Sequence, residues 1–438
     1  MKKVKVYDEI MGSGKTYDAI ERMKGYLKKG VKFIYITPFL DENVRVLNDL
    51  PIGKVFTPLS REELNGKEGY EVLVSFLNEK GLIDLNSFED KKKFKRLNKR
   101  AQFLKFVSQG KNIVSTHQLF MGLKAEDFNL FSDYILILDE VVNPLEIKNI
   151  GATDIQILRD ANLIFIEENT SRVRFIDDDY RDPAFKSVKE LCNNSTVYYL
   201  DKYFFVWVFP IEIFMNFKEV QILTYIFEAS LLSAYFKMYD VKYELRIKDS
   251  TSKLEEIKEL LNIYEGKANS IEGLNTSFSK TWVENLSKSN AKKITESVSN
   301  LFKRSFKTKS IENAFTTFKD DKSKFKGKGY AKGFISINAR STNDFRHKKS
   351  MAYFGNRFFK PQQISFFNER NIQLNQDLWA LSELIQWIWR GCIRDSKRMN
   401  LYIPSERMRS LMYDWLEGRF NDSIIGSQGK FTSLKEFN

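Results

Sequence analysis

The feature that most constrains the fold lies at residues 4–20, VKVYDEIMGSGKTYDAI. Apolar residues alternate at Val4 and Val6, a glycine-containing turn follows, and a helical apolar pattern resumes after Thr16. A strand, a glycine loop, a Lys-Thr pair and a helix, in that order, form the context of a phosphate-binding loop. The stretch therefore predicts an α/β domain with a phosphate site near its first helix.

The turn contains the groups that a bound phosphate requires. Gly12 and Gly14 let the backbone turn sharply, with Ser13 between them, so that several N–H groups face one phosphate. The N-terminus of the following helix adds partial positive charge. We expect Lys15 to reach the β- and γ-phosphates and the hydroxyl of Thr16 to take a coordination site on Mg²⁺.

A pair of carboxylates follows a second diagnostic run. Residues 134–138, YILIL, are all apolar and lead directly into Asp139 and Glu140. A fully buried parallel strand delivers its last residues to the carboxyl edge of the sheet, where ligands bind in α/β folds. We expect Asp139 to hold Mg²⁺ and Glu140 to orient and deprotonate an attacking water. Residues 33–36 and 112–117 predict further strands of this sheet.

Composition limits the class of protein. The 438 residues suit two or three domains, and a net charge of +13 favours a polyanionic partner, nucleic acid before membrane. Only Cys192 and Cys392 are present, which excludes a disulfide framework and favours a reducing, cytoplasmic compartment. The start of the chain lacks the apolar core of a signal peptide, and the longest apolar run, 203–209, is far too short to span a membrane.

Two segments interrupt the predicted sheet. Residues 60–110 are helical in pattern and rich in basic residues, and residues 145–219 contain helix-like and hairpin-like pieces. Alternation at 243–247 predicts a strand of a second sheet. We therefore place the domain change near residue 238, giving domains 1–238 and 239–438.

The predicted second domain holds lysines interleaved with aromatic residues, at 286–332. Two interpretations stay open for this segment. The aromatic rings could stack on nucleic-acid bases while the lysines contact phosphates, or the rings could form a core beneath solvated lysines. Residues 333–338 predict a strand that leads into a polar turn.

The last strong element is the helical pattern at 378–394. Gln386, Arg390 and Arg394 recur every four residues, which predicts that they share one face of the helix. Two aligned arginines on an otherwise apolar helix require an anionic partner, and a γ-phosphate bound between two domains would provide one.

Taken together, these stretches resemble the superfamily 2 helicases, particularly the compact ones of bacteriophages. Residues 11–16 resemble motif I, and 138–141 match the D-E-x-x form of motif II. The stretches that occupy the places of weaker motifs are Thr37 with Pro38, Thr116 with His117, 224–230, 338–343, and Gln386 with Arg390 and Arg394.

The resemblance implies two RecA-like parallel-sheet domains, the first with an inserted subdomain, and ATP with Mg²⁺ in the cleft between them. Catalysis would then involve Lys15, Asp139, Glu140, Gln386, Arg390 and Arg394. Nucleic-acid contacts would come from Thr37, Pro38, Thr116, His117, Arg340, Thr342 and Asn343. The family usually places its second motif VI arginine seven residues after the Gln, and Arg394 is eight after Gln386, so Arg390 is the better candidate for the arginine finger.

The function implied is an ATP-dependent translocase or helicase in phage DNA replication or recombination. Its expected partners are single-stranded or branched DNA and other replication proteins. Two alternatives remain open: an ATP-driven remodelling or annealing factor that separates no strands, and a DNA-binding protein whose ATPase is vestigial.

Overall fold

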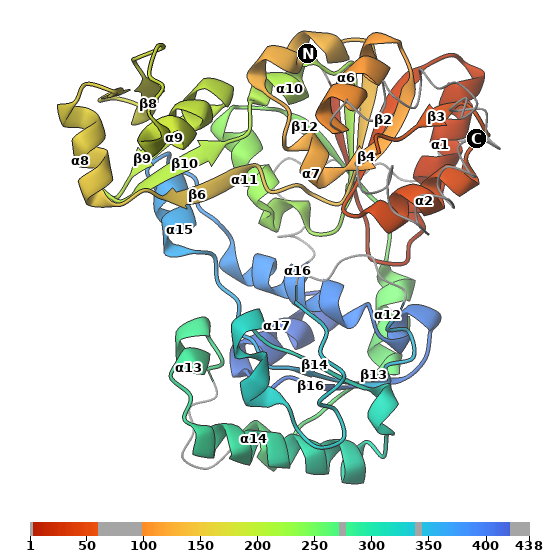
Figure 1. The fold of residues 1–438 in the computed structure, drawn as a ribbon. Coiled ribbons are helices and arrows are strands. Elements are labelled where there is room, and N and C mark those ends of the chain that lie inside the picture. The colour runs from red at the N-terminus through yellow and green to blue at the C-terminus, as the bar shows by residue number, and fades with distance from the viewer. Residues whose placement is uncertain (1–2, 60–98, 271–276, 338–343, 421–438) are drawn as a thin grey trace, which may run out of the picture.

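The computed structural model describes residues 3–59, 99–270, 277–337 and 344–420. The chain forms a larger upper domain that carries an inserted subdomain, and a smaller lower domain (Figure 1). In the part of the chain that is described, no helix is both long and apolar enough to cross a membrane.

The upper domain is built on a parallel sheet of seven strands in the order β12-β1-β11-β5-β2-β4-β3. Its central strands β2, β5 and β11 are almost wholly buried, because helices cover both faces. The strands are β1 (Lys3–Asp8), β2 (Lys32–Thr37), β3 (Val55–Phe56), β4 (Asn112–Thr116), β5 (Tyr134–Asp139), β11 (Glu219–Thr224) and β12 (Tyr243–Ile247).

Two layers of helices enclose this sheet. One core cluster lies beneath α1 and α2, and another lies beneath α6, α7, α10 and α11 on the opposite face. The elements are α1 (Lys15–Lys28), α2 (Leu40–Asp49), α6 (Lys99–Ser108), α7 (His117–Phe120), α10 (Ile211–Asn216), α11 (Leu231–Met238) and the 3₁₀ turns η1 (Ala125–Phe131) and η2 (Phe227–Ala229).

The strand at 243–247 corrects one expectation. It is β12, and it pairs in parallel with β1 at the edge of the upper sheet, from Val4 opposite Tyr243 to Asp8 opposite Ile247. Its alternating pattern reflects this half-covered edge position, and the assignment to a second sheet was wrong. The change of sheet falls after residue 247, so a boundary near 238 does not coincide with it.

The inserted subdomain lies between β5 and β11, where an insertion was expected. It is an antiparallel sheet in the order β6-β10-β9-β8-β7, with its own apolar cluster. Its elements are β6 (Leu145–Asn149), α8 (Ala152–Asp160), β7 (Ile164–Ile166), β8 (Arg172–Phe175), α9 (Pro183–Asn194), β9 (Thr196–Leu200) and β10 (Phe204–Val208).

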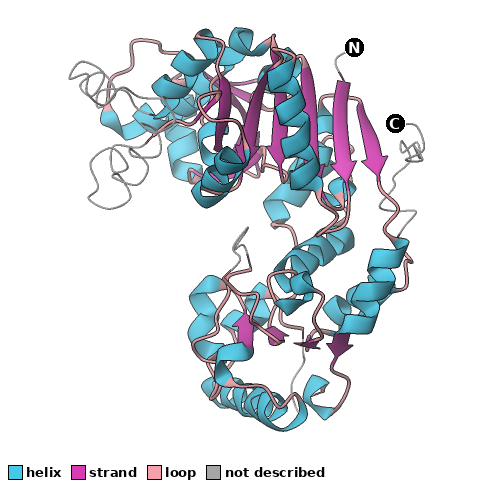
Figure 2. Ribbon diagram, turned by 90° about the vertical axis from the view of Figure 1, so that its right-hand side faces the viewer, coloured by secondary structure: helices cyan, strands magenta, loops and turns pink. Residues whose placement is uncertain are grey.

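The lower domain contains a parallel sheet of four strands in the order β13-β16-β15-β14 (Figure 2). The strands are β13 (Leu261–Ile263), β14 (Asn313–Thr316), β15 (Ser350–Tyr353) and β16 (Met399–Tyr402). The predicted strand at 333–338 contributes only an isolated bridge between Phe334 and Phe315 in its described part. Both domains are therefore parallel α/β units, as the sequence predicted.

The helices of the lower domain form two layers. Helices α16 and α17 pack on the sheet face that is turned toward the upper domain, and α13 and α14 cover the other face (Figure 1). The elements are α12 (Thr251–Leu260), η3 (Lys267–Asn269), α13 (Lys280–Glu284), α14 (Lys288–Asn300), η4 (Leu301–Ser305), η5 (Ser310–Glu312), η6 (Lys319–Phe325), α15 (Pro361–Asn368), α16 (Gln376–Ile388), η7 (Cys392–Asp395) and α17 (Glu406–Leu416).

Helix α15 leaves the lower domain and packs against the upper one. Its Phe366 and Phe367 are fully buried and belong to the core cluster of the upper sheet. Arg370, just after the helix, lies over the ring of Tyr198 in β9 at 4.6 Å from its centroid. This helix therefore joins the inserted subdomain to the second half of the chain.

The helix predicted for 378–394 ends early. Helix α16 stops at Ile388, and Arg394 belongs to the separate turn η7. The break occurs where Gly391 passes between two core side chains, since a Cβ there would lie 2.6 Å from the sulfur atoms of both Met351 and Met399. Gln386, Arg390 and Arg394 therefore do not share one continuous helical face.

Candidate nucleotide site between the two domains

The predicted phosphate-binding loop connects β1 to α1, as expected. Gly12 and Gly14 have φ angles of +78° and +95°, a region that other residues rarely adopt. Gly12 also lies against the lower domain, because a Cβ on it would come within 2.7 Å of Cζ2 of Trp389. Gly14 occupies the N-cap of α1 without a side-chain cap, which leaves N–H groups of the helix N-terminus available to an anion.

Lys15 is the cation of this loop. Its ammonium donates to the backbone carbonyl oxygens of Glu9 and Ile10, the latter at 3.1 Å. Burial lowers the pKa of Lys15, and the negative charges of nearby carboxylates oppose this shift, Glu140 most strongly. The ammonium is therefore held inside the loop, next to the carboxylates that end the strands.

Asp139 and Thr16 form an oxygen pair at the end of β5. The Thr16 hydroxyl donates to Oδ2 of Asp139 at 3.3 Å, and the buried Tyr35 hydroxyl donates to the same atom at 2.6 Å. Burial raises the pKa of Asp139 to about 6, although the bond from Tyr35 lowers it. A hydroxyl and a carboxylate this close fit the oxygen-only preference of Mg²⁺, with phosphate oxygens and water as the remaining ligands.

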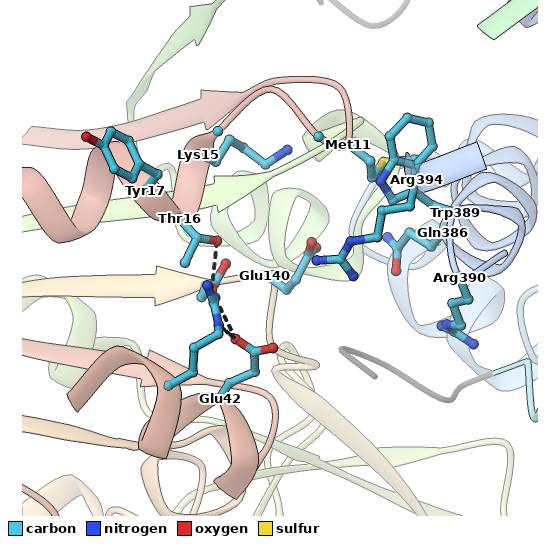
Figure 3. Close-up of a pocket in the computed structure, with 14 residues that line it drawn as sticks. Met11, Lys15, Thr16, Tyr17, Glu42, Glu140, Gln386, Trp389, Arg390 and Arg394 are labelled. Carbon is cyan, nitrogen blue, oxygen red and sulfur yellow. Dashed lines mark hydrogen bonds and ion pairs between the residues drawn. The ribbon is translucent and has the colours of Figure 1, made fainter. Parts of the chain in front are cut away.

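Glu140 has a strained backbone. Its φ is +69°, a conformation that costs a non-glycine residue about 1–3 kcal/mol. Its N–H donates to the Leu223 carbonyl at 2.8 Å, and the Thr224 hydroxyl donates to its Oε2 at 3.4 Å. The turn directs the carboxylate into the pocket (Figure 3).

These groups line one pocket of about 350 Å³ between the two domains (Figure 3). The structure brings all six predicted catalytic residues to its wall: Lys15, Asp139, Glu140, Gln386, Arg390 and Arg394. Gly12, Gly14 and Thr16 also line it. Ser13 belongs to the loop but not to the pocket wall, and its N–H donates to the carbonyl of Ile10 at 3.3 Å.

The two arginines of the lower domain differ in what they can reach. Arg390 is buried, and its guanidinium donates to the backbone carbonyls of Ser336 at 3.0 Å and Ile337 at 3.4 Å. Arg394 is exposed, and its guanidinium points across the pocket toward Glu140 (Figure 3). The sequence favoured Arg390 as the arginine that meets a nucleotide. The geometry favours Arg394 instead.

The predicted nucleic-acid contacts lie at the carboxyl ends of β2 and β4. Thr37 is fully buried, and its hydroxyl bonds with Asn43 at 2.8 Å, so a direct contact from its side chain is not supported. Thr116 accepts the N–H of Leu119 at the start of α7, and His117 bonds with the carbonyl of Asp139 at 2.9 Å. Pro38 is half-buried beside them, whereas Arg340, Thr342 and Asn343 lie outside the described residues.

Sequence reasoning missed several residues of this pocket. Tyr17, which directly follows Thr16, lines the pocket with 67% of its surface exposed, and Trp389 forms the opposite wall. Adjacency to the predicted motifs could have identified both. Glu42 and Arg45 of α2 also line the pocket and form an ion pair of 2.6 Å, but no motif indicates them.

The chain matches two family models. Residues 145–207 match the YonV middle domain, which coincides with the inserted subdomain, and residues 255–416 match the YonV C-terminal Rossmann-like domain. The SPbeta prophage-derived uncharacterized protein YonV of Bacillus subtilis (strain 168) is 34% identical over 442 residues, covering 96% of this chain and 100% of the relative.

Solved structures share the fold at low sequence identity. A structure titled XPD helicase matches 96% of this chain and 95% of its own, with a TM-score of 0.50 and 13% identity. A hypothetical ATP-dependent RNA helicase from Sulfolobus tokodaii matches 95% of this chain and 90% of its own at 11% identity, with a TM-score of 0.26. The chain therefore shares the RecA-like α/β fold of the first of these structures.

Proposed function

The chain belongs to the family of the prophage-derived protein YonV, and we propose that it is a nucleic-acid-dependent ATPase that moves along or unwinds DNA. The observation that carries this proposal is the composition of the pocket between the domains. A phosphate-binding loop and two carboxylates from the upper domain face an arginine from the lower domain. Hydrolysis would then require both domains to meet.

We propose ATP and Mg²⁺ as the ligands of this pocket, since together they supply a transferable phosphoryl group and neutralise its charge. The N–H groups at the start of α1 and the ammonium of Lys15 would bind the phosphates. Asp139 and Thr16 would hold the cation, with Tyr35 fixing the carboxylate of Asp139. Each of these roles uses a group that already faces the pocket or its wall.

Glu140 is the proposed general base. Its carboxylate would accept a proton from the attacking water, and Thr224 restricts its orientation through the 3.4 Å bond. Arg394 would neutralise the charge that develops on the phosphoryl oxygens. Because Arg394 comes from the lower domain, the approach of the two domains would control the rate.

DNA is the proposed partner, with phage replication or recombination as the setting. The net charge of +13 supports a polyanionic partner, and the fold is shared with helicases. The prophage origin of the relative supports the setting. Arg340, Thr342 and Asn343 stay proposed contacts on the strength of their motif alone.

The test is steady-state ATP hydrolysis with Mg²⁺ in the presence of no nucleic acid, single-stranded DNA, duplex DNA, forked DNA or RNA. Strong stimulation by one DNA form is the expected result, and Lys15→Ala should abolish it. Equal rates under all five conditions would contradict a nucleic-acid-dependent ATPase. Turnover retained by Lys15→Ala would remove the phosphate-loop assignment.

A further inference from the structure

The lysine- and aromatic-rich segment of the lower domain separates its two residue types by burial. Among its aromatic residues, Phe302, Phe315, Phe325 and Tyr330 are at most 1% exposed and form one core cluster. None of the large exposed apolar side chains of the described chain is an aromatic residue of 286–332. The rings therefore form a core, and the base-stacking interpretation of this segment is not supported.

The cations of this segment are left on the surface. Residues 286–332 contain thirteen Lys or Arg and four Asp or Glu, a net charge of +9 out of +13 for the whole chain. The runs 301–311 and 322–337 contain no acidic residue. Most of the excess positive charge of the protein is thus concentrated in about a tenth of its length.

Two parts of the segment lie side by side. The ring of Phe302 packs edge-on against Tyr330, with centroids 5.3 Å apart. Thr308 donates to Asn313 at 2.6 Å, and Asn313 donates in turn to the carbonyl of Gly329 at 2.9 Å. These contacts place residues 302–309 beside residues 326–332. Together the two stretches carry seven exposed cations, which we call the basic corner: Lys303, Arg304, Lys307, Lys309, Lys326, Lys328 and Lys332.

Few carboxylates of the chain neutralise the cations of the basic corner. Within the described ranges, none of its seven side chains forms an ion pair with a carboxylate. The nearby Glu312 is paired with Lys349 at 2.5 Å and also accepts the backbone N–H of Lys309 at 2.9 Å, so it offsets charge at one end of the corner only. Cations gathered in this way repel one another, and an external polyanion would relieve that repulsion.

The position of the corner separates it from the nucleotide pocket. Phe302 and Tyr330 belong to the cluster on the sheet face covered by α14, whereas α16, which lines the pocket, packs on the opposite face. Figure 1 shows α14 on the side of the lower domain that is turned away from the upper domain. A ligand of the corner would therefore not compete with a nucleotide.

We propose that the basic corner binds the phosphate backbone of duplex DNA, as a second contact surface outside the cleft. The choice of DNA rests on the proposed function. The choice of a duplex rests on the buried rings, because single strands are usually held by aromatic stacking, whereas a duplex presents dense phosphates, about one charge per 1.7 Å of axis.

The test is the affinity of the full chain for a fluorescent 20-base-pair blunt duplex and for a single strand of equal length, without nucleotide and across a series of salt concentrations. Two independent triple variants address the two parts of the corner: K303E/R304E/K307E and K326E/K328E/K332E. The control is K28E/K29E/K54E, which makes the same charge change at exposed lysines of the upper domain.

Each corner variant should weaken duplex binding at least tenfold. Each should also lower the slope of log Kd against log salt concentration by about 2–3, because each lost phosphate contact lowers that slope by about 0.9. Single-strand affinity should change less than about threefold, and the control should bind the duplex nearly as the wild type does. An equal loss in the control, or an equal loss for the single strand, overturns the proposal.

The ATPase assay separates this inference from the proposed function. If the wild type hydrolyses no ATP and both corner variants lose duplex affinity selectively, the result contradicts only the proposed ATPase. A chain with DNA-stimulated hydrolysis and unchanged duplex affinity in both corner variants contradicts the basic corner alone.

Discussion

Arg390 and Arg394 are four residues apart, yet their guanidinium groups serve different parts of the molecule. Arg390 is bonded to the carbonyls of Ser336 and Ile337 within the lower domain, and Arg394 points at Glu140 across the pocket. Helix α16 ends at Ile388, so Arg390 lies in the turn that follows it and Arg394 lies in the separate turn η7. A structural role and a chemical role are thus assigned to neighbouring arginines.

Arg394→Ala is expected to lower the nucleic-acid-stimulated hydrolysis rate by on the order of 10³, at the lower end of what an arginine finger contributes. Nucleotide affinity should change little, because the loop of the upper domain holds the phosphates. Single-turnover kinetics and binding of a fluorescent ATP analogue measure the two quantities. Arg390→Ala is the matched variant, and it should mainly lower the apparent Tm; a rate loss confined to Arg390→Ala would reverse the assignment.

Glu140→Gln is expected to bind ATP but not hydrolyse it, since the amide cannot accept the proton of the attacking water. The fold should tolerate the change, because Thr224 can still donate to the amide oxygen. Thr224→Val should lower the rate less, as it removes only a bond that orients the carboxylate. Wild-type turnover in Glu140→Gln would exclude Glu140 as the base.

Tyr35→Phe tests whether the hydroxyl of Tyr35 holds Asp139, the proposed cation ligand, in position. The variant removes the hydroxyl that donates to Asp139 at 2.6 Å while keeping the buried ring. Losing the partner of a buried carboxylate costs about 1–3 kcal/mol and leaves its orientation less fixed. We expect a higher Mg²⁺ concentration for half-maximal hydrolysis with the rate at saturating Mg²⁺ largely restored. An unchanged Mg²⁺ dependence would show that Tyr35 does not support the cation site.

The sequence predicted the elements whose pattern is local. The strands β1, β2 and β5, the helix α1 and the insertion before β11 all follow from apolar runs, glycine turns and strand–helix alternation. The loop and the two carboxylates meet because parallel strands end at one edge of a sheet, a rule that needs no side-chain detail.

The predictions that failed concern features that depend on contacts between residues distant in sequence. β12 alternates like any half-covered strand, and only its pairing with β1 assigns it to the upper sheet. Helix α16 ends at Ile388, and the chain then packs closely at Gly391 against Met351 and Met399, which are distant in sequence and leave no mark in the helical pattern. Arg45 enters the pocket through the position of α2, and no local motif indicates it.

Asp8, at the end of β1, gives a prediction about the pH dependence of stability, and the charge of Lys15 acts on its carboxyl group. Its carboxylate is buried and accepts N–H bonds from Ile226 at 2.7 Å and Phe227 at 2.8 Å, so it fastens the turn after β11. Burial raises its pKa from 3.8 to about 7, although the two N–H bonds lower it. Between these values the folded chain keeps a proton that the unfolded chain releases.

The stability contributed by protonated Asp8 is therefore largest near pH 4 and declines as the pH rises toward 7, by up to about 1.4 kcal/mol per pH unit. Asp8→Asn cannot titrate, so this part of the pH dependence should vanish. The apparent Tm of the wild type minus that of Asp8→Asn should fall between pH 5 and pH 8 when both are measured by thermal unfolding in matched buffers. Parallel Tm curves over this range would mean that Asp8 is ionised in the folded chain throughout.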